Sequence, residues 1–257
     1  MANTIYNNKV IEAKAKDLLA TSLNVRNVMA VDNSLTQTAG MIKTINVYTY
    51  SGTAEELENG EGNSGTGSIT FVPNDYEVKT VQQKLAYTDE DYLKDSTIVD
   101  NMLKGANQVM VNKMTEDFTA ELAKATLNES GAFGYSLIVD GISKLNIEDE
   151  SKLFVVIPYA WKAALRKDED YKTARMGEVV YNGQVGTIAG IPVIATKALT
   201  DAAYVMTKDA VKLFMKKDVE VEQDREANTR TNNVFLRSFY VVALADATQI
   251  CKLTKAA

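Results

Sequence analysis

Histidine does not occur anywhere in the 257 residues. Its absence removes the usual general base near neutral pH, the Ser–His and Cys–His nucleophile pairs, and most zinc sites. Carboxylates or lysines could still supply catalysis. The sequence nevertheless favours a protein that is not an enzyme, even before any motif is considered.

Cysteine occurs once, at position 251, so no intramolecular disulfide can form. This usage fits a reducing cytoplasm. Cys251 lies in the apolar stretch Thr248–Leu253, where a buried cysteine in a strand is the expected role.

Long apolar runs are also absent, and none approaches the roughly 20 residues that cross a bilayer. Residues 1–20 are polar, with Asn7, Asn8 and Lys9 where a signal peptide would carry apolar side chains. We therefore expect a protein made and used in solution, with no membrane partner.

Basic residues are fewer than acidic ones, 28 against 34, which gives a net charge of −6. A protein that coats nucleic acid by neutralising phosphates usually has a basic excess. The charge therefore argues against such a coat, although it leaves room for occasional contact between an inner surface and DNA.

The region 41–88 has the pattern of a long two-stranded arm. Met41–Tyr50 is rich in β-branched and aromatic residues, and a second strand-like stretch runs from Ser68 to Val81. Between them, Ser51–Gly67 is polar and rich in glycine, which predicts a tip without a core. Because a lone hairpin is barely stable, we expect something outside the subunit to hold this arm.

The arm also lacks basic residues along most of its length. Between Thr44 and Val78 there is no lysine or arginine, and the acidic residues are Glu55, Glu56, Glu58, Glu61, Asp75 and Glu77. Two interpretations remain open. The tip is a solvated loop, or it is an acidic surface that docks on a basic patch of another subunit, with electrostatics setting the register.

The first 40 residues form a separate unit. Apolar residues recur at roughly helical spacing within Lys9–Leu19, which predicts a short amphipathic helix. A helix of about a dozen residues is marginal alone in water. It therefore needs a partner surface, either in its own domain or on a neighbouring chain, and residues 21–39 follow it as an extended segment.

A long helix is predicted from about Ser96 to Leu127. Thr88–Asp91 before it has the form of a capping box with acidic residues in the first turn. A 3.6-residue apolar stripe follows. Its members are Ile98, Val99, Met102, Leu103, Ala106, Val109, Met110, Met114, Phe118 and Leu122. A helix of this extent would be roughly 45–50 Å long at 1.5 Å per residue.

The remaining sequence alternates shorter elements, so the fold class is α+β. Pro158 suits the first turn of a helix that runs through Trp161 and Leu165, and Tyr181–Gln184 predicts a tight turn. The predicted strands are Leu153–Ile157, Gly190–Ile194, Ala203–Met206, Val219–Glu222, Asn233–Leu244 and Thr248–Leu253.

No catalytic, cofactor or metal site emerges from the motifs. Gly183–Gly190 lacks the Gly-x-Gly-x-x-Gly spacing and precedes a strand signal, and Gly60–Gly67 lacks the Gly-Lys-Ser/Thr ending of a P-loop. Acidic triplets at 89–91, 148–150 and 168–170 fit helix caps or solvated turns better than a calcium loop.

The order of these parts resembles the tailed-bacteriophage major capsid protein family with the Hong Kong 97 fold. Gly186–Ala195 is similar to the family's Gly-x-x-x-Gly-x-Pro-Val segment. It lies after the helix that carries Trp161 and before Ala203–Met206, and Asn233–Asp246 is similar to the family's final strands. The resemblance covers nearly the whole chain.

The resemblance implies a set of domains. Residues 1–40 would be the N-terminal arm, 41–88 the extended loop, and 89–130 the peripheral domain with its spine helix. Residues 131–215 would be the axial domain, and 216–257 would return to the peripheral domain with the C-terminal strands.

It also implies a function and partners. Subunits would self-assemble through hexamers and pentamers into an icosahedral virion capsid in the host bacterial cytoplasm. The shell would enclose phage double-stranded DNA by weak, non-specific contact, and portal, scaffolding or decoration proteins would join it. Each extended loop would lie across a neighbour, and candidate basic contacts for its acidic residues are Lys216, Lys217, Arg225, Arg230 and Arg237.

Two features depart from some family members. Forty residues leave little room for an N-terminal scaffolding region, so that region was cleaved or scaffolding is a separate protein. No lysine lies between Lys43 and Lys79 in the arm. We therefore predict a shell without covalent cross-links through the extended loop.

Two other functions compete with a phage capsid. An encapsulin-type nanocompartment shares the fold but encloses an enzyme cargo, and sequence physics separates the two poorly. A carboxylate-based enzyme such as a glycosidase would need paired carboxylates that converge in a pocket, and no spacing here suggests them.

Overall fold

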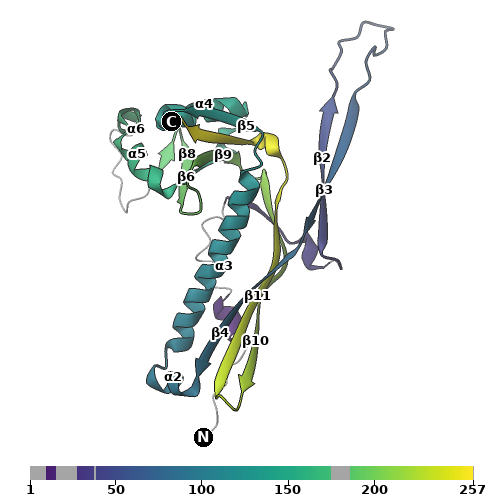
Figure 1. The fold of residues 1–257 in the computed structure, drawn as a ribbon. Coiled ribbons are helices and arrows are strands. Elements are labelled where there is room, and N and C mark those ends of the chain that lie inside the picture. The colour runs from purple at the N-terminus through teal and green to yellow at the C-terminus, as the bar shows by residue number, and fades with distance from the viewer. Residues whose placement is uncertain (1–9, 16–27, 38, 175–185, 257) are drawn as a thin grey trace.

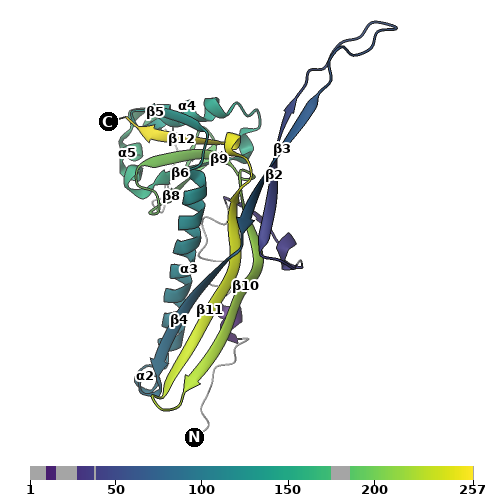
Figure 2. The same cartoon turned by 45° about the vertical axis from the view of Figure 1, so that its right-hand side comes forward.

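The computed structural model describes residues 10–15, 28–37, 39–174 and 186–256. The chain forms an elongated α+β molecule with a long sheet and helix, a lobe at one end of them, and a projecting arm (Figures 1 and 2).

The strands belong to three sheets. In spatial order, the long sheet contains β1 (Ala30–Asp32), β10 (Val211–Glu226), β11 (Thr231–Leu244) and β4 (Lys79–Thr88). The lobe sheet contains β5 (Leu127–Gly131), β12 (Ile250–Lys255), β9 (Ala202–Thr207), β6 (Leu153–Pro158), β8 (Ile191–Thr196) and β7 (Thr187–Ile188). The arm consists of β2 (Ile42–Ser51) and β3 (Ser68–Glu77).

The helices connect and cover these sheets. The α-helices are α2 (Asp89–Lys94), α3 (Ile98–Leu122), α4 (Tyr135–Leu145), α5 (Lys162–Lys167) and α6 (Glu169–Ala174), and residues 10–15 are also helical. Short 3₁₀ turns are η2 (Ser34–Thr36), η3 (Glu150–Lys152), η4 (Tyr159–Trp161) and η5 (Ala247–Gln249).

The predicted long helix is confirmed, but it is shorter than expected. The capping box is present at Thr88, where it starts the separate helix α2. The 25 residues of α3 span about 38 Å. Extension to Leu127 was wrong, because Leu127–Gly131 pairs with β12 as a strand. Val109 is half exposed, so its place in the buried stripe was also wrong.

The main core lies between α3 and the long sheet, which run side by side (Figure 1). Leu103, Met110 and Phe118 on α3 are almost completely buried there. Ile11 and Ala15 join the same core, so the described part of the N-terminal helix packs on its own subunit. The rest of Lys9–Leu19 lies outside the described residues.

A second core lies between α4 and the lobe sheet. All six residues of β9 are buried because the strand is covered on both faces. Ala203 and Val205 face the lobe core, while Tyr204 and Met206 face the main core, as the two-residue period of a strand requires. The lobe and the spine of the molecule therefore share one strand.

The other predicted strands of the lobe and C-terminus are confirmed. A two-residue turn joins β7 to β8, with positive φ at Ala189 (49°) and Gly190 (82°), as in the primed turns that hairpins prefer. Cys251 is buried in β12, as expected. The turn predicted at Tyr181–Gln184 lies outside the described residues.

The arm is a hairpin with continuous pairing from Ile42↔Glu77 at its base to Ser51↔Ser68 near its tip. Beyond Val78 the chain enters β4, which pairs along its length with β11 in the long sheet. Residues 79–88 therefore anchor the arm to the body of the subunit.

Candidate subunit-interaction surfaces

The base of the arm is fixed to the body. Ile45 and Tyr76 pack against a small core that includes Phe214 and Val241. The Tyr76 hydroxyl donates a 3.1 Å hydrogen bond to the carbonyl of Leu244, and burial raises the pKa of this tyrosine. The direction in which the arm leaves the subunit is therefore set by packing within the chain.

The outer half of the arm exposes large apolar side chains. Tyr50, Ile69 and Phe71 are 62%, 52% and 58% exposed. Tyr50 lies directly opposite Ile69, and Phe71 follows two residues later on the same face. A contiguous exposed apolar surface of this kind marks a site where another molecule binds.

The tip beyond this apolar face is organised by one of its acidic residues. The Glu55 carboxylate accepts hydrogen bonds from the Ser64 amide and hydroxyl, both at 2.7 Å, and from the Gly65 amide at 2.9 Å. The hydroxyl of Ser64 contributes most to lowering the pKa of Glu55. Glu56, Glu58 and Glu61 are exposed. Of the four predicted contact residues at the tip, Glu55 thus has a role inside the arm.

Two candidate basic partners lie at the opposite end of the molecule from the arm tip (Figure 1). Arg225 contacts Asp89 at 2.6 Å, and Arg230 contacts Glu90 at 2.9 Å. These pairs tie α2 to the turn between β10 and β11. The tip cannot reach these arginines within one subunit.

The other candidate basic residues lie along the long sheet. Arg237 on β11 contacts Glu222 at 2.7 Å, and Lys217 on β10 contacts Glu220 at 2.8 Å. The register of β10 shifts on both sides of Lys217, in the stretch that also contains Lys216. Such bulges re-aim side chains and often occur at functional places in a sheet.

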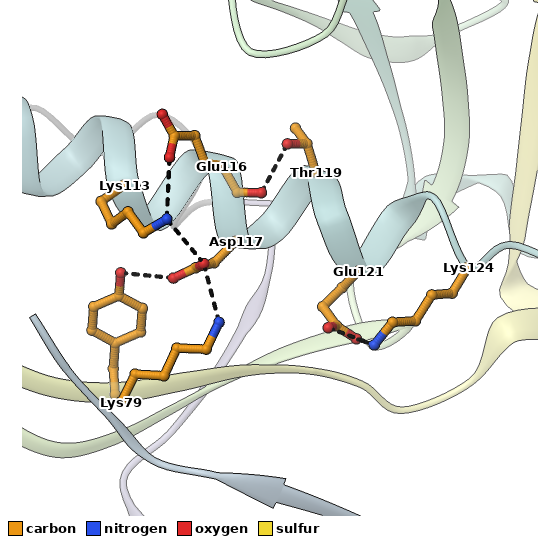
Figure 3. A network of polar contacts seen from close by, with 8 residues as sticks. Lys79, Lys113, Glu116, Asp117, Thr119, Glu121 and Lys124 are labelled. Atoms are coloured by element: carbon orange, nitrogen blue, oxygen red, sulfur yellow. Dashed lines mark hydrogen bonds and ion pairs between the residues drawn. The ribbon is translucent and has the colours of Figure 1, made fainter.

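A polar network inside the body was not predicted from the sequence. Asp117 on α3 is largely buried, and it accepts hydrogen bonds from Lys79 of β4 at 3.2 Å and from the Tyr240 hydroxyl of β11 at 3.1 Å. Lys113 lies 3.8 Å from the same carboxylate (Figure 3). Burial, followed by the charge of Asp117, raises the pKa of Tyr240. One carboxylate therefore links the long helix to two strands.

A signal for Asp117 was present in the sequence. The residue stands seven positions after Met110 and next to Phe118, within the apolar stripe of the helix. An acidic residue on a buried helical face must be paired, but its partners come from strands far away in the chain.

No cluster of three or more metal-ligating side chains occurs among the described residues. Within that part of the chain, no helix has the length and apolar character needed to span a bilayer.

No family model matches the sequence. The chain is 25% identical to the major capsid protein of Staphylococcus phage phiMR11 over 245 residues, which cover 92% of this chain and 89% of that protein. The chain is a homologue of a phage major capsid protein.

Solved structures agree on the fold. The capsid structure of cyanophage P-SCSP1u superposes with a TM-score of 0.71 at 11% identity and covers 89% of this chain and 86% of that chain. The mature capsid of bacteriophage PhiM1 has a TM-score of 0.69 at 10% identity, covering 100% and 89%. A virus-like particle from Pyrococcus furiosus also reaches 0.69, at 9% identity, covering 97% and 100%. The expected Hong Kong 97-type fold is thus confirmed for this capsid-protein homologue.

Proposed function

We propose that this chain is the structural subunit of a tailed-phage capsid. It assembles through hexamers and pentamers into an icosahedral shell around double-stranded DNA. The observation that carries the proposal is the arm, which leaves the body with an apolar outer half that its own subunit does not cover. The phage capsid relative across 92% of the chain supports the same function.

The shape of the molecule gives the arm its role. The core on α3 and the lobe core stabilise the body, whereas the hairpin beyond Ser51↔Ser68 has only its own two strands. A two-stranded ribbon gains little stability alone. Burial of Tyr50, Ile69 and Phe71 against an adjacent copy provides the missing contacts, at roughly 25 cal/mol per Å² of apolar surface removed from water.

Charge sets the register of that contact. Glu56, Glu58 and Glu61 at the tip meet basic residues of the neighbour, drawn from Lys216, Lys217, Arg225, Arg230 and Arg237. Because several of these already contact carboxylates of their own chain, the tip adds a second acidic partner. Exposed ion pairs contribute only about 0–1 kcal/mol each, so affinity comes from the apolar face.

The division into domains follows the family. Residues 1–40 form the N-terminal arm, 41–88 the extended loop, 89–130 and 216–257 the peripheral domain, and 131–215 the axial domain at the capsomer centre. Assembly takes place in the host bacterial cytoplasm with portal and scaffolding or decoration proteins. The shell is non-covalent, because the arm has no lysine between Lys43 and Lys79.

Negative-stain microscopy of the purified full-length protein tests the proposal. Closed shells or isolated capsomers are expected. A compact monomer that stays monomeric at high concentration would contradict it, as would a ladder of covalent oligomers in denaturing electrophoresis for the absence of cross-links.

A charge-reversal pair tests the acidic tip. Glu56→Lys with Glu58→Lys should reduce shell yield, while Glu148→Lys with Glu150→Lys changes the net charge equally at exposed positions of the lobe. Glu55 is left intact because its carboxylate holds the tip together. Equal shell yields from both variants would remove electrostatic docking from the proposal.

An encapsulin-type compartment is less well supported. The fold alone does not separate the alternatives, since the Pyrococcus virus-like particle and the phage capsids superpose almost equally well. The sequence relative, however, is a phage capsid protein. A carboxylate enzyme has no supporting geometry among the residues described.

A further inference from the structure

A group of cationic side chains surrounds an exposed tyrosine on the lobe. The ammonium groups of Lys162 and Lys197 lie 5.8 Å and 5.7 Å from the centroid of the Tyr159 ring. Arg166 and Lys167 line the same hollow of about 340 Å³ beside Tyr159. The residues come from η4 and α5 and from the segment after β8, so the fold brings two distant parts of the sequence together. We call these five residues the lysine–tyrosine cluster.

The lysines of this cluster have no carboxylate partner among the described residues. Neighbouring lysines differ, because Lys172 pairs with Glu169 at 2.6 Å and Lys152 with Asp149 at 3.1 Å. The adjacent Asp168 turns its carboxylate to backbone amides, including that of Tyr135 at 2.7 Å. In a chain with a net charge of −6, this concentration of unneutralised positive charge is a local exception.

The chemistry of the cluster selects its ligand. Ammonium and guanidinium groups are donors without acceptors, and the phenol adds a further hydrogen-bond donor. Like charges held close together repel one another, and an anion with several oxygens relieves this repulsion. Tyr159 is 54% exposed and presents an aromatic surface among the cations. Cations combined with an accessible aromatic ring are typical of surfaces that follow a nucleic-acid strand.

We propose that the lysine–tyrosine cluster binds the phosphate backbone of nucleic acid. Lysines bind phosphates as flexible point charges and make no base-specific pattern here, so the binding is independent of sequence. The identity of the ligand in the particle rests on the proposed capsid function, in which the nucleic acid is the packaged DNA. The binding itself is a property of the lobe of a single subunit.

The test compares two triple variants of the full-length protein by fluorescence anisotropy with a short, random-sequence DNA duplex. Lys162→Gln, Lys167→Gln and Lys197→Gln remove three charges from the cluster. Three exposed lysines elsewhere, changed to Gln together, form the matched control with the same net charge: Lys94, Lys104 and Lys208. Circular dichroism of both variants confirms that they fold.

The cluster variant should bind at least about tenfold more weakly at low salt, because each lost phosphate contact also lowers the salt slope by about 0.9. The control should keep the affinity and slope of the unchanged protein. Equal losses in the two variants would show a net-charge effect alone and overturn the proposal. So would the absence of DNA binding by the unchanged protein, or binding of inorganic phosphate without binding of the duplex.

Microscopy separates this inference from the proposed function. If the cluster variant forms normal shells and loses only DNA affinity, both proposals stand. If the unchanged protein binds DNA through the cluster but never assembles, the binding site stands and the capsid function fails.

Discussion

The arm and the body of this subunit contain similar side chains in opposite situations. Phe118 on α3 is 1% exposed, whereas Phe71 on β3 is 58% exposed. The body completes its cores within one chain. The arm has a fixed base and a regular hairpin, but its outer half has no core of its own. The comparison shows that secondary structure and stability are separate matters: the arm has the first and must obtain the second from another molecule.

The largest effect should come from a cavity in the body. Phe118→Ala removes a ring from the core between α3 and the long sheet, and should lower the free energy of unfolding by about 3–5 kcal/mol. Urea denaturation of unassembled subunits measures this. A loss below about 1 kcal/mol would mean that the helix does not rest on the sheet as described.

The corresponding change in the arm should leave subunit stability intact. Ile69→Ser with Phe71→Ser should shift the free energy of unfolding of the free subunit by no more than about 0.5 kcal/mol. Shell formation, followed by light scattering, should nevertheless be lost. Normal assembly by this variant would contradict the role of the apolar face.

A hydroxyl deletion makes the same comparison on a smaller scale. Tyr240→Phe leaves the largely buried Asp117 with one donor fewer and should cost about 1–3 kcal/mol of unfolding free energy. Tyr50→Phe removes the same group from the exposed arm and should have no measurable effect. Equal denaturation midpoints for the two variants would show that the Asp117 network does not stabilise the body.

Acid should have the smallest effect, and it should act at the α2 end. Hydrogen bonds from Asn232, followed by those from Arg225, lower the pKa of Asp89 below its ordinary 3.8. This carboxylate therefore contributes stability that is fully present above pH 3.8 and is lost as the pH falls through its lowered folded value.

Amide hydrogen exchange measures this local effect at the α2 end. Exchange there should accelerate below pH 3.8, and Asp89→Asn should make it less dependent on pH. Exchange that speeds up uniformly through the whole sheet would argue against the local effect.

Much of the architecture was predictable because it depends on local periodicity. The stripe through Leu103, Met110 and Phe118 predicted the long helix, and alternation in 41–50 predicted the first strand of the arm. Prediction failed where a distant partner decided the outcome. Leu127–Gly131 became β5 because β12 lies beside it, and Arg225 and Arg230 contact α2, which is far away in the chain.

The sequence by itself determined the elements, the acidic tip without lysine, and the absence of histidine chemistry, because each of these is a property of neighbouring residues. Tertiary structure alone decided that Asp117 is a buried link, that Glu55 serves the tip from within, and that Tyr159 collects lysines from two segments. Those outcomes depend on which surfaces the chain brings together over long separations, and local pattern carries no information about such meetings.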